Sequence, residues 1–186
     1  SMQAIARHYV KLPEANIEQL AKTRKRVGPA RKQRGMTAKG RARMRRLDDE
    51  RAKYDLVNLP QTIARRVQRS GAPSRRLAVE MQMAVAIEIL LMAPIRVGNL
   101  AALRLGEHLV WSKPGNKGCL TIAINGAEVK NEMDLEHELP EESARLVATY
   151  LKQYQPLLGD KPGPFLFPGR FGPPKVANLM SNQIKR

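Results

Sequence analysis

The stretch APIRVGNLAALRLGEHLVW, residues 93–111, lies midway along the chain, and the patterns on its two sides decide the fold. Immediately before it, residues 77–93 are apolar except for two glutamates and one glutamine. A run of this length with two acidic side chains is too short and too polar to span a membrane, so we expect a buried helix over residues 74–92. Pro94 interrupts this helix, and apolar residues at helical spacing then predict a second helix that continues to Leu105.

After residue 108 the sequence changes from helical spacing to the composition of strands. Four short segments have strand composition or alternate between apolar and polar residues: residues 109–111, 119–124, 127–130 and 133–139. Asn125-Gly126 is a two-residue hairpin signal, so we expect the second and third segments to pair across a tight turn. Together these segments predict a small three-stranded antiparallel sheet.

Helical patterns flank the predicted sheet. Residues 56–69 predict a helix with Pro60 in its first turn, and residues 140–154 predict another helix with one apolar face. An irregular loop, GPFLFPG (residues 163–169), follows, and apolar residues then recur at helical spacing over residues 176–184 with no capping residue after them. The order of helices, antiparallel strands and helices indicates an α+β fold, and the uncapped last helix suggests a fragment of a longer protein.

The positive charge is concentrated in one part of the chain. Lysine and arginine number 33 against 17 acidic residues, a formal charge of +16, and residues 22–76 alone hold 19 basic and 4 acidic residues. Residues 22–46 contain three glycines and one proline and have almost no periodic apolar residues, so we expect a flexible basic arm there. We therefore divide the chain into an arm or the end of a DNA-binding domain, residues 1–55, and a folded domain, residues 56–186.

This charge distribution favours nucleic acid as the partner, because clustered lysine and arginine side chains bind phosphates. A merely solvated basic surface is the alternative. The candidate DNA contacts lie at the end of the basic stretch: Arg65, Arg66, Arg69, Arg75 and Arg76. Cys119 is the only cysteine and the three histidines are scattered, so we expect no disulfide, no metal and no other cofactor. No signal peptide is visible, which suits a cytoplasmic protein that does not enter the membrane.

Two further basic residues stand out by their positions. Arg96 lies in an otherwise apolar segment, where a guanidinium needs an anionic partner, either a phosphate or the carboxylate of Glu88 or Glu107. Lys130 follows the predicted hairpin, where a lysine can reach a ligand and donate a proton. An ordinary solvated turn lysine is the simpler interpretation of Lys130.

The ordered motifs resemble the catalytic domain of the tyrosine recombinases, the phage-integrase family, over roughly residues 56–186. The stretch quoted above is similar to the family's first arginine box, in which a long helix delivers an arginine followed by Leu-x-x-Leu and a step into a three-stranded sheet. LTIAINGAEVKNEMDLEHELP, residues 120–140, resembles the family's hairpin with a catalytic lysine. ESARLVATYLKQY and FLFPG resemble the helix and the loop that come next.

This resemblance implies roles for individual residues. Arg96 would match the first catalytic arginine, which holds the scissile phosphate, and Lys130 would match the lysine that protonates the departing 5′ oxygen. The family attacks DNA with a tyrosine, forms a 3′-phosphotyrosyl link and needs no metal or nucleotide cofactor. Where the family has a carboxylate three residues after the arginine, this sequence has Asn99.

None of the four tyrosines matches the family's nucleophile. Tyr150 and Tyr154 lie four residues apart on an apolar helix face, as core residues do, whereas Tyr9 and Tyr54 precede the motifs. His137 falls in the strand pattern, which favours a structural role. The family's His-x-x-Arg box and nucleophilic tyrosine would lie beyond the chain.

The resemblance therefore implies site-specific recombination or integration of double-stranded DNA by the complete protein, as in a phage or other mobile element. Such recombinases act as homo-oligomers assembled on DNA. We expect the chain itself to bind DNA without cleaving it. A non-catalytic nucleic-acid-binding module is the alternative.

Overall fold

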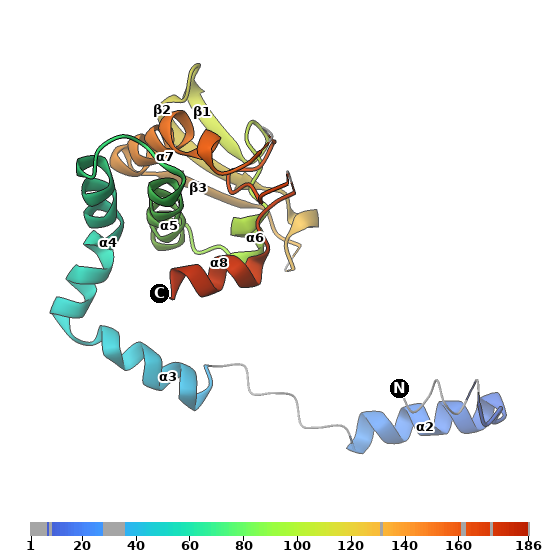
Figure 1. Cartoon of the computed structure of the whole chain (residues 1–186). Coiled ribbons are helices and arrows are strands. Elements are labelled where there is room, and N and C mark those ends of the chain that lie inside the picture. The colour runs from blue at the N-terminus through green and yellow to red at the C-terminus, as the bar shows by residue number, and fades with distance from the viewer. Residues whose placement is uncertain are drawn as a thin grey trace. The chain divides into compact units, whose positions relative to one another are not determined.

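The computed structural model, shown in Figure 1, describes residues 7, 9–27, 36–130, 132–160, 163–171 and 173–185. The chain divides into two compact units, Ser1–Arg45 and Arg46–Arg186. As far as the described residues go, the first unit is helical and all named strands belong to the second.

Two helices form the described part of the first unit, α2 (Glu14–Val27) and α3 (Ala38–Met44). α2 begins directly after Pro13 and continues into the stretch that was expected to be a flexible arm, residues 22–46. That expectation is wrong for residues 22–27 and 38–44, while residues 28–35 lie outside the described part of the chain. Lysine, arginine and alanine favour helices, and this propensity outweighs the lack of periodic apolar residues.

A single turn, η1 (Arg45–Leu47), contains the boundary between the two units, and the long helix α4 (Glu50–Arg69) is the first helix that lies wholly in the second unit. Asp49 caps α4, and residue 55, the expected end of the arm, lies inside this helix. Pro60 was expected in a first turn, but it lies in the interior of α4 and is buried. Because proline has no backbone N–H, one hydrogen bond of the helix is missing there.

The helix α5 (Arg75–Met92) is the central helix of this unit, which confirms the predicted buried helix. Ser74 caps it, and the preceding turn contains Gly71 with a φ of 98°, a left-handed conformation that glycine adopts without steric cost. α5 packs against α4, α7 (Glu141–Gln153) and α8 (Ala177–Ile184), as Figure 1 shows. Contacts on several sides explain why α5 is apolar around most of its circumference.

The helix after Pro94 is shorter than predicted. α6 spans only Val97–Ala101, and the residues directly after Ala102 are not helical. The backbone nitrogen of Leu105 donates to the carbonyl of Pro164 at 2.6 Å, and Arg104 forms a β-bridge with Phe165. The apolar loop expected over residues 163–169 therefore pairs with the segment that would otherwise extend the helix.

Three antiparallel strands follow in the order β1–β2–β3, as predicted: β1 (Leu109–Lys113), β2 (Lys117–Ile124) and β3 (Leu135–Leu139). β2 is the central strand and pairs with both neighbours. The predicted alternation in β3 is confirmed, since Leu139 is buried while Glu136 and Glu138 are exposed. α7 packs on β2 and covers the apolar face of the sheet.

The connection between β2 and β3 differs from the sequence prediction. Asn125-Gly126 does not form a two-residue hairpin, because the 3₁₀ turn η2 (Gly126–Glu128) begins there, and residues 127–130 form no strand. A Cβ atom at Gly126 would lie 2.9 Å from the backbone of Glu132. Glycine is thus required here by a close approach of two chain segments rather than by a tight turn.

A network of polar side chains crosses the core of this unit. The fully buried Gln82 donates to the hydroxyl of Tyr150 at 3.2 Å, and this hydroxyl donates to the carbonyl of Leu166 at 3.0 Å. The ammonium of Lys175 donates to the side-chain oxygen of Gln82, and to that of Gln183 on α8 at 2.9 Å. Burial lowers the pKa of Lys175 from 10.5 to about 8.

The structure is a mixed fold of helices with one small antiparallel sheet, as predicted. Tyr150 and Tyr154 are core residues, also as predicted. No helix in the described ranges has both the length and the apolar character that crossing a bilayer requires. Cys119 is exposed on β2, and a hydrogen bond with Glu138 raises the pKa of its thiol.

Candidate nucleic-acid interface

Arg96 lies at the start of α6, between the buried Ile95 and the half-buried Val97. Its side chain is exposed, so the argument that a buried guanidinium requires an anion does not apply. The exposure has a different consequence. An arginine held at the surface on a well-packed segment can receive a phosphate from solvent, because its planar guanidinium can bond two phosphate oxygens at once.

Glu88 and Glu107, the two carboxylates that were considered as partners of Arg96, also make contacts of their own. Glu88 is buried on α5 and accepts a hydrogen bond from the hydroxyl of Ser143 on α7. Glu107 forms an ion pair with Arg104, with 2.8 Å between Oε2 and Nε. Glu88 therefore ties α5 to α7, and Glu107 belongs to a separate surface cluster.

Lys130 is exposed in the turn that follows η2. Two nearby residues that the structure describes make contacts within this connection. Val129, directly before it, is only 5% exposed, and the carboxylate of Asp134 accepts a hydrogen bond from the backbone nitrogen of Gly126 at 2.6 Å. The lysine thus projects into solvent from an anchored loop rather than from the tip of a tight hairpin.

A cluster of charged side chains connects this loop to the segment after α6. Nη2 of Arg104 lies 2.9 Å from Oε2 of Glu128, which is the last residue of η2. The buried His108 accepts a hydrogen bond from the backbone nitrogen of Arg104 through Nδ1 at 3.1 Å. Because Nδ1 accepts, the ring carries its proton on Nε2, which donates to Oε1 of Glu128 at 3.2 Å.

These contacts change the acidity of Glu128. The hydrogen bond from His108 lowers the pKa of the Glu128 carboxyl from its ordinary value of 4.5, and the charge of Arg104 acts in the same direction. Desolvation opposes the change. Glu128 is therefore held as a carboxylate at neutral pH, with both of its oxygens engaged.

Glu107, His108 and Glu128 also bring three potential metal-ligating atoms within 4.8 Å of one another. The guanidinium of Arg104 pairs with both carboxylates, at 2.8 and 2.9 Å. A positive group thus already engages one oxygen of each acid, and a metal ion would have to displace it. The geometry is that of an ion-pair network.

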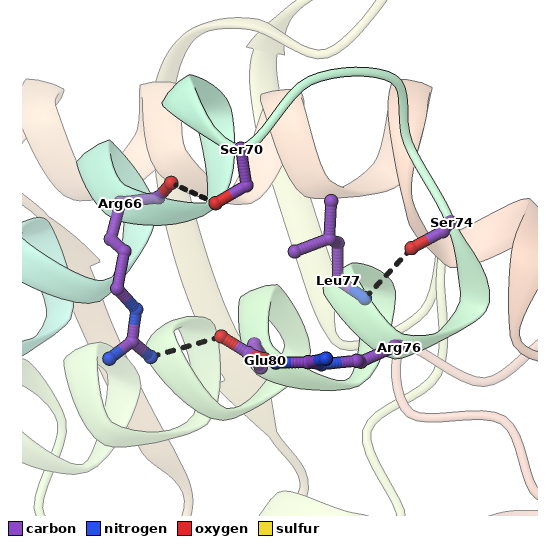
Figure 2. Close-up of a pocket in the computed structure, with 6 residues that line it drawn as sticks. All are labelled: Arg66, Ser70, Ser74, Arg76, Leu77 and Glu80. Carbon is purple, nitrogen blue, oxygen red and sulfur yellow. Dashed lines mark hydrogen bonds and ion pairs between the residues drawn. The ribbon is translucent and has the colours of Figure 1, made fainter.

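The five arginines predicted to contact DNA are all exposed, on α4 or at the start of α5: Arg65, Arg66, Arg69, Arg75 and Arg76. Two of them share one carboxylate, since Glu80 lies 3.0 Å from Arg66 and 3.5 Å from Arg76. Figure 2 shows Arg66 and Glu80 pointing toward each other across a hollow of about 470 Å³, which Ser70, Ser74 and Leu77 also line. The charge of this pair of arginines is thus partly neutralised.

The other three arginines have no carboxylate within ion-pair distance among the residues that the structure describes: Arg65, Arg69 and Arg75. Arg65 and Arg69 lie one turn apart on α4, where they line a second hollow of about 500 Å³ together with Thr62, Arg66 and Ser70. Positive charges without nearby acids attract anions most strongly. This part of α4 is therefore a favourable surface for phosphate.

The remaining candidates occupy unremarkable places. His137 lies on β3, opposite Ile122 of β2, and is half-buried. Tyr9 and Tyr54 are exposed, at 85% and 69%. Asn99 is half-buried, and its side-chain nitrogen has no hydrogen-bond partner among the described residues.

The sequence analysis did not single out Arg104, His108 or Glu128 as members of a site. Only their positions in the sequence could have pointed to them, since Arg104 follows Arg96 by eight residues and Glu128 precedes Lys130 by two. Their proximity to one another depends on the packing of the sheet, which sequence spacing does not report.

Comparisons with models of protein families, with curated proteins and with solved structures found no match to this chain.

Proposed function

We propose that this chain is the DNA-binding first part of a tyrosine-type recombinase catalytic domain, whose complete protein cuts and rejoins double-stranded DNA. One observation carries the proposal. An exposed arginine, Arg96, directly follows the central helix, and an exposed lysine, Lys130, lies in the β2–β3 connection of the sheet that comes next. This is the order in which the resembling family presents its phosphate-binding arginine and its proton-donating lysine.

In this proposal the two residues have different roles at the same phosphodiester. Arg96 bonds the non-bridging oxygens and stabilises the negative charge that builds up on them. A tyrosine oxygen attacks the phosphorus, the bond from phosphorus to the 5′ oxygen breaks, and that oxygen takes a proton from the ammonium of Lys130. The products are a 3′-phosphotyrosyl link and a free 5′ hydroxyl, and the reverse sequence joins a new strand.

The attacking tyrosine is not one of the four in this chain. Tyr150 and Tyr154 are buried in the core, where Tyr150 bonds Leu166 and Gln82. Tyr9 lies in the first compact unit, and Tyr54 lies on α4 well before Arg96. We therefore place the nucleophile outside residues 1–186, and we expect the complete protein to assemble as a homo-oligomer on DNA in the cytoplasm.

The first experiment measures binding. Fluorescence anisotropy with a labelled duplex at several salt concentrations should show an affinity that falls steeply with salt, because the contacts run from arginine to phosphate. Replacing Arg65 and Arg69 together by glutamine should weaken binding more than replacing the exposed Lys117 and Lys152 by glutamine, which removes the same charge elsewhere. Equal losses in the two double variants would contradict a DNA surface on α4.

The second experiment tests the chemistry. In the complete protein, Arg96→Ala should abolish formation of a covalent protein–DNA adduct on a nicked duplex while leaving most of the duplex affinity, since the α4 arginines bind separately. Unchanged cleavage by Arg96→Ala would refute its assignment to the phosphate. An adduct formed by residues 1–186 alone would refute the placement of the nucleophile.

A non-catalytic nucleic-acid-binding module is the second candidate. Asn99 favours it, because this residue stands where the resembling family has a carboxylate, and an amide cannot supply the negative charge of that group. A complete protein that binds duplex DNA but forms no adduct under any condition would establish this alternative.

A further inference from the structure

We propose that Glu128 is a positioning residue for Lys130, and that Arg104 and His108 hold Glu128 in place from the segment that follows Arg96. The inference rests on the proposed function, in which Lys130 supplies a proton to the departing oxygen. It adds three residues that the sequence motifs do not contain, and it assigns them no contact with DNA.

The geometry leaves Glu128 little freedom. Its Oε1 accepts from Nε2 of His108 at 3.2 Å, and its Oε2 accepts from Nη2 of Arg104 at 2.9 Å. The two donors come from different directions, one from a buried ring and one from an exposed guanidinium. A carboxylate that is bonded through both oxygens is fixed in rotation as well as in position.

The donors are themselves fixed. The ring of His108 is buried, with 5% of its side chain exposed, and its Nδ1 bonds the backbone of Arg104. The backbone carbonyl of His108 accepts from the nitrogen of Ala123 on β2 at 2.9 Å. Glu107 also holds the guanidinium of Arg104, through Nε. The cluster is therefore attached to the sheet and not only to the loop.

Stability does not explain the ion pair between Arg104 and Glu128. More than a third of the side chain is exposed in both Arg104 and Glu128, at 36% and 38%, and ion pairs with this exposure contribute little to folding. A contact that adds little stability but holds a surface loop is better explained by the residue that the loop presents, which here is Lys130. Lys130 is two residues beyond Glu128, and the buried Val129 between them transmits the position of one to the other.

The same contacts relate the two predicted catalytic side chains. Arg104 and His108 lie on the segment that begins at Arg96, whereas Glu128 lies on the loop that presents Lys130. A general acid must come within hydrogen-bond distance of the oxygen that it protonates, and a displacement of about 1 Å can reduce a rate about 100-fold. The cluster thus sets the position of Lys130 relative to a phosphate held by Arg96.

The first test needs only residues 1–186. Hydrogen exchange of the amides over residues 126–134 should become faster in Glu128→Ala, whereas exchange in α5 and α7 should be unchanged. Glu107→Ala is the control, because it removes a carboxylate from the same guanidinium without touching the loop, although Glu107 is more exposed than Glu128, at 54% against 38%. Equal exchange of the loop in Glu128→Ala and in the unaltered protein would overturn the anchoring role.

The second test uses the complete protein and a substrate with sulfur in place of the bridging 5′ oxygen. A thiolate leaves without receiving a proton, so this substrate does not need a general acid. Glu128→Ala should slow cleavage of the ordinary substrate at least about 10-fold, by displacing the acid, and should leave cleavage of the sulfur substrate unchanged. Glu128→Gln, which keeps one acceptor oxygen, should cleave the ordinary substrate at a rate between those of Glu128→Ala and the unaltered protein.

The possible outcomes separate the two proposals. If the unaltered complete protein cleaves neither substrate, the proposed function fails, and the exchange experiment still decides whether Glu128 anchors the loop. If the unaltered protein cleaves but Glu128→Ala slows both substrates equally, Glu128 acts on the fold in general, and its role as a positioning residue is overturned. Selective slowing of the oxygen substrate supports the inference.

Discussion

Two polar networks in the second unit join segments that are far apart in the sequence, and they differ in burial. Gln82, Tyr150 and Lys175 link α5, α7 and the last loop through the core. Arg104 and Glu128 link the segment before β1 to the connection between β2 and β3 at the surface. Unpaired polar groups are costly only where water is excluded, so the inner network should control folding, whereas the outer network should control the placement of one loop.

The largest effect is expected from breaking the inner network. Tyr150→Phe removes a hydroxyl and leaves the carbonyl of Leu166 and the amide of Gln82 without this partner in a dry environment. We expect the free energy of unfolding to fall by about 1–3 kcal/mol, the usual consequence of an unsatisfied buried polar group. Urea denaturation followed by circular dichroism measures it. Tyr54→Phe, at an exposed tyrosine, should change stability by less than about 0.5 kcal/mol; similar losses in both variants would contradict the buried network.

The second prediction concerns pH. The pKa of Lys175 falls from 10.5 to about 8 on folding, so between these values the unfolded state binds more protons. Stability contributed by this group therefore rises as the pH increases from about 8 to about 10.5. Lys175→Met should remove this rise, and Lys152→Met, at an exposed lysine on α7, should not. The measurement is the difference in urea midpoint between each variant and the unaltered protein over this pH range, and a constant difference for Lys175→Met would refute the assignment.

A smaller effect is expected at the α4–α5 turn. Glu80→Gln frees Arg66 and Arg76 from their shared carboxylate, so duplex DNA should bind roughly threefold to tenfold more tightly and with a steeper salt dependence. Glu141→Gln is the control, because it makes the same change in charge beside Arg145 on α7. If both variants tighten binding equally, total charge decides affinity, and the turn is not a specific contact surface.

The smallest effect on stability is expected from the outer network. Glu128→Gln should lower the free energy of unfolding by less than about 1 kcal/mol at neutral pH, since more than a third of each side chain of the ion pair is exposed. The pKa of Glu128 is lowered in the folded protein, so any contribution is present above about pH 4.5 and disappears as the pH falls through the folded pKa. Denaturation at pH 7 and at acidic pH measures the change. A loss as large as that in Tyr150→Phe would contradict the difference in stability that we expect between the two networks.

The elements that sequence predicted well are those whose signals are local. The apolar run predicted α5, and alternation predicted β3, because helix and strand periods are directly readable. Pro60 was misplaced because α4 tolerates a missing hydrogen bond in its interior, where the neighbouring packing compensates. The hairpin predicted from Asn125-Gly126 was wrong for a similar reason. The glycine accommodates the backbone of Glu132, which comes close only in the folded chain.

The candidate site was predictable to a lesser extent. Arg96 and Lys130 stood out through their motifs, and the structure places both at the surface. Arg104, His108 and Glu128 did not, because the contact between His108 and Glu128 spans twenty residues and depends on the register of β1 and β2. The same limit applies to Glu80, whose effect on Arg66 follows from the way α4 and α5 pack.

Cys119 has a practical consequence for all of these measurements. It is the only cysteine of the chain and is exposed on the central strand, so a single fluorophore or spin label can be attached there without removing other thiols. Glu138 raises the pKa of this thiol, so coupling to maleimides should be slow at neutral pH and faster in mildly alkaline buffer. One probe placed in this way would report on the sheet that carries the Lys130 loop.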